Sequence, residues 1–564
     1  MKTTSLAVAL ALILGVSLCD AGPARDVANQ AEELLKQGSL QAAETVIDSA
    51  LAVYPDDPDL LGVKAQVLFQ QKDFIKALEY FNRILAQDQK NPQALYGAGM
   101  SALELEETQQ ALDYFERGTK TRKLKGDFLY GTALTQMKMG DLASADATIR
   151  KAINTDEENP TYHRALGDIN YEKQVWSIAI GQYRQAIELD STLTGLYYRL
   201  ARASLNSRNV NDAVDYYRRY LKATSDDTTA WRELGLIYEK SNNPAEAIFC
   251  YKKITELAPN DGNSWFALGM LQFGVNSYEE AGSSLEKAVA LGAHVADAYK
   301  TLAKVYQNRE EYYKADTAYT LYEQQAGAPD SAEYWFEKGK VMLKIGQKEA
   351  AFYDRAVQAF DRTIQLDSTN ASYWEYAGLA RYYKNDFAGA IPFFKERIEL
   401  GGETVNAYRN LAICYLKTEK YDLAAKALED ALALKPDDAV MHSMVGKIYT
   451  VTGNYDGAIR HLTAALQNSG ADNSNSLSAE DKCKINGDLG YCYVVQRDAQ
   501  KAISYLETAV GCDPRNTDYL FNLASAYHLD NQLKEANKYY KEVLALDPNH
   551  QGAKEGAART TPRQ

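Results

Sequence analysis

Apolar residues recur along this chain at the spacing of amphipathic helices that follow one another in pairs. The clearest copy of the pattern consists of Trp231, Leu234, Gly235, Tyr238, Ala247, Tyr251 and Pro259. The first four residues stand at i, i+3, i+4 and i+7, which is one face of a helix. Ala247 and Tyr251 stand four positions apart, as on one face of a second helix. Proline then ends the unit, and the short connection between the two helices predicts that they lie antiparallel.

The same pattern returns with a step of 34 residues. Counted from Ala24, repeats begin at residues 24, 58, 92, 126, 160, 194, 228, 262 and 296 without a slip, and alanine occupies the twentieth place of each. Small insertions then move the later starts to near residues 332, 371, 405, 439, 483 and 517. A fixed period of this length predicts one continuous solenoid over residues 24–550, in which each repeat stacks on its neighbours.

Two insertions and a tail depart from the period. Residues 347–355 are expected to lengthen the second helix of repeat ten. Residues 468–478, rich in Asn and Ser, predict an exposed mobile loop. Residues 551–564 form a C-terminal tail that contains Gly552, Gly556 and Pro562 and is therefore expected to be a weak helix former.

The repeated motif, with its Trp-x-x-Leu-Gly-x-x-Tyr core at residues 231–238, resembles the tetratricopeptide repeat. The resemblance covers residues 24–550 and implies an all-α solenoid, a right-handed superhelix of about fifteen helix-turn-helix repeats. Proteins of this family generally act as scaffolds that bind proteins or peptides. In the family, places two, five, six, nine, twelve and thirteen of each repeat line a concave groove.

Those places contain the candidate partner-binding residues. The basic candidates lie in repeats five to seven and are Arg164, Arg199, Arg202 and Arg232. The apolar candidates are Tyr96, Met100, Tyr130, Phe266, Met270, Tyr376 and Tyr382. Arg409 and Asn410 resemble part of the family's carboxylate-binding clamp, but the full clamp, spread over three adjacent repeats, is missing.

Each group of candidates has a structural alternative. Four arginines on one face could bind the carboxylates of a partner, yet they could also pair with acidic neighbours such as Asp168 and Glu233. The apolar residues could receive an apolar peptide or helix, or they could complete the core between repeats. The sequence alone leaves both alternatives open.

The composition argues against several other functions. Lys and Arg total 62 against 76 Asp and Glu, so the net charge of −14 disfavours nucleic acid as a partner. No phosphate-binding loop, nucleophile elbow or His-Glu-x-x-His motif is found, and His442 and His461 have no further ligand at metal spacing. We therefore expect a protein that is not an enzyme and that carries no catalytic residue, metal or cofactor.

The first residues have the features of an export signal. Lys2 precedes an apolar run from Leu6 to Leu18, which is too short for a typical membrane span. We favour a signal peptide of residues 1–21 that is cleaved after Ala21, and the alternative is a lipid anchor on Cys19. Both interpretations place the protein in the periplasm or outside a bacterial cell, and no later segment is apolar enough to span a bilayer.

Two of the cysteines are placed so that they could form a disulfide bond. Cys483 lies at the start of the first helix of its repeat, and Cys512 lies at the end of the second helix. Antiparallel helices bring those two ends together, so an oxidising compartment would allow a disulfide bond between them.

The ends of the solenoid suggest an alternative function. Neither end shows an evident polar cap in the sequence, and two open ends could stack head to tail. The alternative to a groove-binding scaffold is therefore a self-assembling extracellular structural protein that forms filaments.

Overall fold

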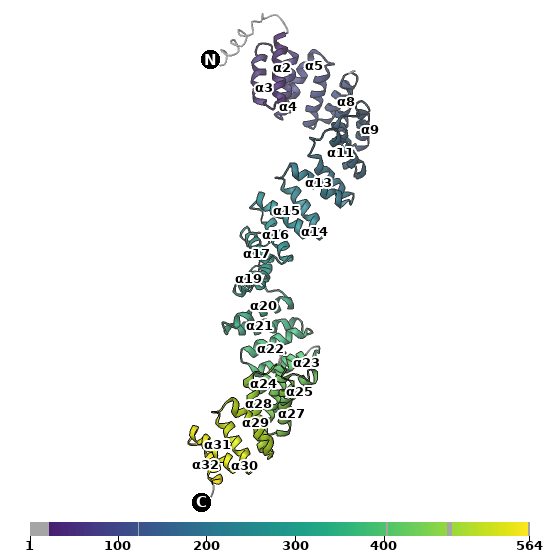
Figure 1. Ribbon diagram of the computed structural model, residues 1–564. Coiled ribbons are helices and arrows are strands. Elements are labelled where there is room, and N and C mark those ends of the chain that lie inside the picture. Colours follow the sequence, from purple (N-terminus) through teal and green to yellow (C-terminus); the bar gives the residue numbers. More distant parts are fainter. Residues whose placement is uncertain (1–21, 122, 402–403, 471–475, 562–564) are drawn as a thin grey trace, which may run out of the picture. The chain divides into compact units, whose positions relative to one another are not determined.

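The computed structural model describes residues 22–121, 123–401, 404–470 and 476–561. These residues contain 31 α-helices, and the helices from α2 to α31 follow one another as helix-turn-helix pairs (Figure 1). The predicted all-α fold of about fifteen repeats is confirmed. The predicted signal peptide, including Cys19, lies outside the described residues. No described helix is both long enough and apolar enough to cross a lipid bilayer.

The chain divides into two compact units, and the first ends at Asp261. Its described helices are α2 (Gly22–Lys36), α3 (Leu40–Leu51), α4 (Pro58–Gln70), α5 (Phe74–Gln87), α6 (Pro92–Glu104), α7 (Thr108–Thr119), α8 (Lys125–Lys138), α9 (Leu142–Ile153), α10 (Pro160–Glu172), α11 (Trp176–Leu189), α12 (Leu196–Asn206), α13 (Val210–Ala223), α14 (Thr228–Lys240) and α15 (Pro244–Leu257).

The second unit begins at Gly262. Its described helices are α16 (Gly262–Gly274), α17 (Tyr278–Ala290), α18 (Val295–Asn308), α19 (Tyr312–Ala326), α20 (Ala332–Gly346), α21 (Ala351–Leu366), α22 (Ala371–Tyr383), α23 (Phe387–Glu399), α24 (Val405–Lys417), α25 (Tyr421–Leu434), α26 (Ala439–Thr452), α27 (Tyr455–Asn468), α28 (Ala479–Gln496), α29 (Ala499–Cys512), α30 (Thr517–Leu529), α31 (Leu533–Leu546) and α32 (Gln551–Thr560).

The boundaries of the helices follow from local capping chemistry. Asp57 is the N-cap of α4 and accepts hydrogen bonds from the backbone N–H groups of Asp59 and Leu60, while Pro58 occupies the first turn, where no N–H partner is needed. The turn between the two helices of a repeat places its fifteenth residue in the left-handed region in nearly every repeat. Gly140 and Gly453 adopt this conformation without steric cost, and Asn242 tolerates it.

The core lies where the two helices of a repeat cross. A Cβ atom added to Gly99, at the eighth place, would lie 2.5 Å from the ring of Phe115, at the twenty-fourth place. Gly167 and Tyr183 show the same close approach, at 2.6 Å. Ala179, at the twentieth place, is fully buried. Small residues at the eighth and twentieth places therefore leave room for a large residue at the twenty-fourth place to fill the crossing. This packing explains why the same residue sizes recur at these places in each repeat.

The two insertions are accommodated in different ways. In repeat ten, α21 is 16 residues long, which agrees with the expected lengthening of the second helix. Between repeats thirteen and fourteen, α27 ends at Asn468 and α28 begins at Ala479. Leu477, inside the predicted mobile loop, is buried in the core of the last repeats, and its N–H donates to the hydroxyl oxygen of Ser469 at 3.1 Å. The described ends of this insertion therefore pack against the repeats.

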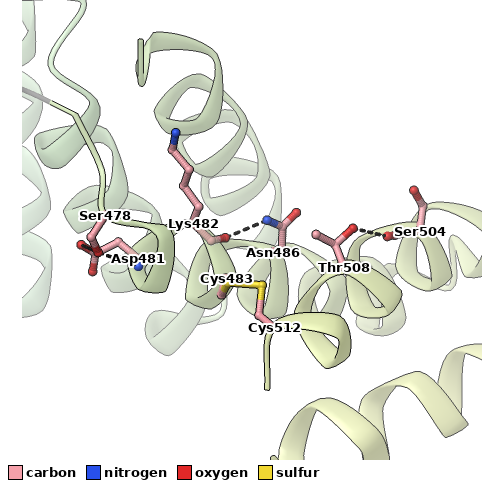
Figure 2. The surroundings of a disulfide bond; sticks show 8 residues. All are labelled: Ser478, Asp481, Lys482, Cys483, Asn486, Ser504, Thr508 and Cys512. Carbon is pink, nitrogen blue, oxygen red and sulfur yellow. Dashed lines mark hydrogen bonds between the residues drawn. A yellow bond between two sulfur atoms is a disulfide. The ribbon is translucent and has the colours of Figure 1, made fainter. Parts of the chain in front are cut away.

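A disulfide bond joins the two helices of repeat fourteen. Cys483, near the start of α28, is bonded to Cys512, the last residue of α29, and their Cα atoms lie 6.1 Å apart (Figure 2). A cross-link across a loop of this size typically stabilises a fold by about 2–4 kcal/mol. Cys250, Cys414 and Cys492 are buried free thiols. The structure thus places the two cysteines together in the way that the antiparallel arrangement suggests.

The C-terminal tail differs from the expectation of a weak helix former. Residues 551–560 form α32, which packs on α31. Gly556 lies so close to Tyr540 that an added Cβ would be 2.4 Å from its ring, and the amide of Asn537 donates to the carbonyl oxygen of Ala557 at 2.9 Å. The glycine is tolerated because the tertiary contact needs a side chain no larger than hydrogen.

The exposed residues of α32 give the last repeat a polar outer surface. Ala553 is buried, whereas Gln551, Lys554, Glu555 and Arg559 are exposed. Such a polar cap is what a terminal repeat needs to avoid self-association. The sequence suggests an uncovered apolar face here, whereas in the structure α32 covers the repeat before it.

Candidate functional site

The first helices of neighbouring repeats contact one another and share one face, here called the first-helix face. In the first unit α6 contacts α8 and α8 contacts α10, and in the second unit α28 contacts α30. The second helices form the opposite face, here called the second-helix face. The predicted groove residues are carried by the first helices.

The four predicted arginines lie on α10, α12 and α14. The side chains of Arg199 and Arg202 are exposed, and those of Arg164 and Arg232 are half-buried. Arg199 lies 3.8 Å from the carboxylate of Asp168, and Arg232 forms a 2.7 Å ion pair with Asp261. Two of the four charges are therefore paired in the folded chain.

Buried tyrosines hold the carboxylates between these arginines. The hydroxyl of Tyr183, on α11, donates to Asp168 at 2.8 Å, and that of Tyr217, on α13, donates to Glu233 at 2.5 Å. Burial raises the pKa of Asp168 above its usual range. Both tyrosines are fully buried, so their hydroxyl groups reach from the second helix through the core to the first-helix face.

Arg202 is exposed and forms no ion pair with the described residues. Its guanidinium lies over the ring of Tyr198 at 5.9 Å, and no carboxylate of the described residues comes within 4.0 Å of it. Arg164 donates to the hydroxyl of Tyr130 at 3.4 Å. The first-helix face of repeats five to seven is thus a network of alternating charges in which Arg202 keeps the capacity to bind a carboxylate.

The apolar candidates of the first unit are largely packed between repeats. Tyr130 is only 8% exposed, and its ring lies 5.8 Å from that of Tyr162. Tyr96 packs against Phe115, and Met100 is half-buried beside the same core. Tyr130 therefore contributes to the seam between repeats rather than to an open surface, because neighbouring first helices approach closely at that place.

The apolar candidates of the second unit differ in their exposure to solvent. Met270 is 39% exposed and presents an open apolar surface, whereas Phe266 stacks on His294 with ring centroids 4.4 Å apart. Tyr376 packs against Phe336, at 5.1 Å. Tyr382 lies half-buried at the end of its helix. Of these four candidates, Met270 is the one whose side chain is exposed.

Arg409 and Asn410 lie on α24. Arg409 is exposed and Asn410 is half-buried, so both reach the first-helix face. They stay candidates for a polar contact, without a built binding site.

The repeat-packing residues of repeat seven lie in or beside the core. Leu234 is 2% exposed, Tyr251 is 4% exposed and Ala247 is fully buried. A Cβ atom on Gly235 would lie 3.3 Å from both Cys250 and Tyr251, so these neighbours would have to shift by a few tenths of an ångström to admit it. Trp231, half-buried, donates its indole N–H to the carbonyl oxygen of Ser225 at 2.9 Å. Tyr238 and Pro259 keep their places at the eleventh position and after α15.

The histidines form a pair rather than a metal site. The Nδ1 atoms of His442 and His461 lie 3.0 Å apart, and Glu429 lies 3.7 Å from the second nitrogen of His461. Burial and the neighbouring His442 lower the pKa of His461. Within the described ranges, no group of three or more His, Cys, Asp or Glu side chains could hold a metal ion.

Sequence reasoning missed two cavities on the second-helix face. One lies between α13, α14 and α15, and the other lies between α17, α18 and α19. A signal for the chemistry of these cavities was present, because a glutamate precedes a tyrosine by 20 residues at several junctions between repeats. The importance of that spacing becomes visible only when the helices are packed.

Comparison with known families agrees with this geometry. Family models described as tetratricopeptide repeat match residues 29–92, 76–124 and 198–262, residues 382–448, and residues 517–550. The segments that these models match are tetratricopeptide repeats. This repeat family typically forms non-enzymatic scaffolds for protein–protein interaction.

The relatives are distant. The chain is 25% identical to a TPR repeat-containing protein of Methanocaldococcus jannaschii over 182 residues, which are 32% of this chain and 30% of the relative. It is 24% identical to anaphase-promoting complex subunit 3 of Schizosaccharomyces pombe over 188 residues, which are 33% of this chain and 27% of the relative. The chain thus spans less than a third of the length of these two relatives.

A solved structure is also only distantly similar to this chain. The crystal structure of YrrB, described as a TPR protein with an unusual peptide-binding site, is 18% identical and covers 36% of this chain and 100% of its own, with a TM-score of 0.32. A likeness of this strength shows nothing about the site of the present chain.

Proposed function

We propose that this tetratricopeptide repeat chain is an exported, non-enzymatic scaffold that binds proteins or peptides on its first-helix face. The observation that supports this most directly is the charged network of repeats five to seven, where Arg202 is exposed and has no carboxylate of the described residues within 4.0 Å. A guanidinium in that position can bind a carboxylate of a partner through two parallel hydrogen bonds.

Export is supported by two separate features. The apolar run from Leu6 to Leu18 has the length of a signal peptide, and the Cys483–Cys512 disulfide is of a kind that persists in oxidising compartments. We propose that the mature protein acts in the periplasm or outside a bacterial cell.

The binding proposal is tested by a photo-crosslinking amino acid at position 202, used in the native host. A matched chain carries the same crosslinker at Arg117, a half-buried residue of the second-helix face. We expect a defined protein adduct at position 202 that is missing at position 117. Equal adducts at both positions would contradict the proposal.

The affinity of the partner found in this way then tests the role of the arginines. R199E/R202E is expected to weaken binding at least about tenfold, because two favourable charges become repulsive. The matched control is R83E/R117E, which reverses two arginines on the second-helix face. The proposal fails if the two double variants bind equally well.

The export proposal has its own measurement. N-terminal sequencing of protein from the envelope and from the medium is expected to begin at residue 22. A blocked N-terminus at Cys19 carrying a lipid would select the alternative anchor, and an intact Met1 in all fractions would refute export.

A further inference from the structure

A tyrosine–glutamate hydrogen bond recurs at junctions between repeats. The tyrosine occupies the eleventh place of one repeat, and the glutamate occupies the twenty-fifth place of the repeat before it. The bonds measure 2.5–2.6 Å and join Tyr306 to Glu286, Tyr449 to Glu429 and Tyr527 to Glu507. A half-buried or buried tyrosine at this place is thus satisfied by an acceptor on the second-helix face.

The junction between repeats six and seven breaks this pattern. The twenty-fifth place of repeat six is Arg218, which cannot accept a hydrogen bond. Tyr238, at the eleventh place of repeat seven, is 6% exposed, and its hydroxyl has no hydrogen-bond acceptor among the described residues. It is the one tyrosine hydroxyl within the described ranges that is buried without an acceptor, and such groups call for an explanation.

A cavity of about 200 Å³ lies beside this tyrosine. Leu221, Trp231 and Phe249 form apolar walls, and the two aromatic rings meet edge to face at 5.8 Å. Phe249 is 49% exposed, so this wall opens to solvent. Burial raises the pKa of the Cys250 thiol, which also lines the cavity, to about 12, so the thiol is neutral and behaves as a small apolar group. The cavity is smaller than sites for drug-sized ligands, which span roughly 300–1,000 Å³, and it suits one side chain.

Cations lie at the edge of the same cavity. Arg218 forms a 3.4 Å ion pair with Glu246, and its guanidinium lies over the ring of Tyr238 at 5.7 Å. Lys222, one turn further along α13, is exposed and has no carboxylate of the described residues within 4.0 Å. An unpaired donor and an unpaired cation therefore border one apolar cavity.

The junction between repeats eight and nine provides an internal control. Its cavity, of about 360 Å³, is lined from the same repeat places, with Tyr306 in place of Tyr238. Glu286 stands where Arg218 stands, and Lys314 stands where Glu246 stands. The two junctions share their framework, but the charges are exchanged, and only the second supplies an acceptor to its tyrosine.

We infer that the cavity of repeats six and seven binds an acidic segment of a partner protein, in which an Asp or Glu carboxylate accepts the Tyr238 hydrogen bond and lies against Arg218 and Lys222. A large apolar residue next to that carboxylate fills the space between Trp231 and Phe249. The carboxylate supplies from outside the acceptor that Glu286 supplies within the chain at repeats eight and nine. The inference rests on the proposed scaffold function and adds a second contact surface, on the second-helix face.

The test uses the full chain labelled with 5-fluorotryptophan at its five tryptophans. The resonance of Trp231 is assigned with W231F, and ¹⁹F NMR follows titration with N-acetyl-Phe-Glu-amide up to about 10 mM. We expect a saturable shift of the Trp231 resonance and binding at least about tenfold weaker for N-acetyl-Phe-Gln-amide, because a charge-assisted hydrogen bond is lost. No saturable shift at Trp231, or equal affinity for the two peptides, would overturn the inference.

Variants test the named contacts. R218E/E246K gives this junction the charges of repeats eight and nine and is expected to weaken binding of the Glu peptide at least about tenfold. E286Q, in the other cavity, is the matched control and should leave the Trp231 titration unchanged. Y238F keeps the shape of the cavity and removes one donor, so it is expected to weaken binding severalfold even if the double variant folds poorly.

These outcomes are separable from those of the function proposal. A partner that crosslinks at position 202 and binds R218E/E246K normally would leave the scaffold function standing and refute the second surface. A saturable Trp231 shift without any adduct at position 202 would instead support the cavity and refute the first-helix face as the binding site.

Discussion

The junction of repeats six and seven and the junction of repeats eight and nine are assembled from the same repeat places but differ in charge. Tyr238 and Tyr306 are both buried, at 6% and 8% exposure, and each lines a cavity on the second-helix face. Tyr306 donates to Glu286 at 2.6 Å, whereas Tyr238 faces Arg218 and has no acceptor among the described residues. The comparison teaches that the repeat determines the shape of each cavity, while two charged side chains determine its chemistry. These side chains are Arg218 and Glu246 in the first cavity and Glu286 and Lys314 in the second.

The largest expected effect tests the shared framework. Leu234→Ala and Leu302→Ala remove a leucine that is 2% exposed at the seventh place of each junction, and each is expected to cost about 2–5 kcal/mol. Hydrogen exchange of α14 and α18 measures the free energy of opening. Leu236→Ala, at a residue that is 43% exposed, is the control and should be nearly neutral. A large effect at only one junction would mean that the two frameworks are not equivalent.

The next effect separates the two tyrosines. Tyr306→Phe is expected to lower the free energy of unfolding by about 1 kcal/mol, because it deletes a hydrogen bond to a carboxylate. Tyr238→Phe is expected to be neutral or slightly stabilising, since it removes an unpaired buried hydroxyl. Urea denaturation of the two variants beside wild type gives both values. Equal losses would show that Tyr238 has an acceptor in solution.

Exchanging the charges should make the first junction resemble the second. R218E/E246K provides an acceptor for Tyr238 and is expected to raise the free energy of unfolding by about 0.5–1 kcal/mol, while the exposed ion pair itself contributes little. E286R/K314E makes the opposite exchange and should lower stability by a similar amount. Thermal denaturation at two salt concentrations distinguishes the hydrogen bond from charge effects, because salt screens the charges of exposed groups. A change of stability with the same sign in both double variants would refute the explanation.

Alkaline pH is expected to give the smallest difference. Burial raises the pKa of both tyrosines; Glu286 raises that of Tyr306 further, whereas Arg218 opposes the rise at Tyr238. Because the folded-state pKa lies above the unfolded value of about 10, this contribution is complete below pH 10 and is lost as the pH rises. Near pH 10.5 the loss is about 0.8 kcal/mol for a tyrosine that stays un-ionised in the fold. Tyr306→Phe should therefore reduce the fall of the free energy of unfolding above about pH 10 at least as much as Tyr238→Phe does. A steeper fall in Tyr306→Phe than in wild type would contradict the assignment.

Much of the fold could be predicted because its contacts are local and repeated. The first helices begin at residues 58, 92, 160, 228 and 262, as the 34-residue register predicts. Differences occur where the register alone is insufficient: α12 begins at Leu196 rather than at residue 194, and α28 begins at Ala479 rather than at residue 483. In α28 the extra turn follows an insertion, and Ser478 caps it by accepting from the N–H of Asp481.

The site was less predictable, since exposure depends on neighbours that the register does not specify. Tyr130 and Arg202 both stand at first-helix places, yet Tyr130 is 8% exposed and Arg202 is open to solvent. The acceptors of the buried tyrosines lie 15, 16 or 20 residues away, on another helix. A missing acceptor, as at Tyr238, can be recognised only by comparing several packed junctions.

The sequence by itself determined the repeat, its length, the alternation of first and second helices, and the small residues at the crossings, because those properties follow from helical periodicity and side-chain size. Only the tertiary structure decided which carboxylates are held by Tyr183 and Tyr217, that Cys483 meets Cys512, and that Gly556 lets α32 cover the last repeat. It also decided that Tyr238 lacks a partner. These outcomes depend on distances between helices, which short-range patterns along the chain do not encode.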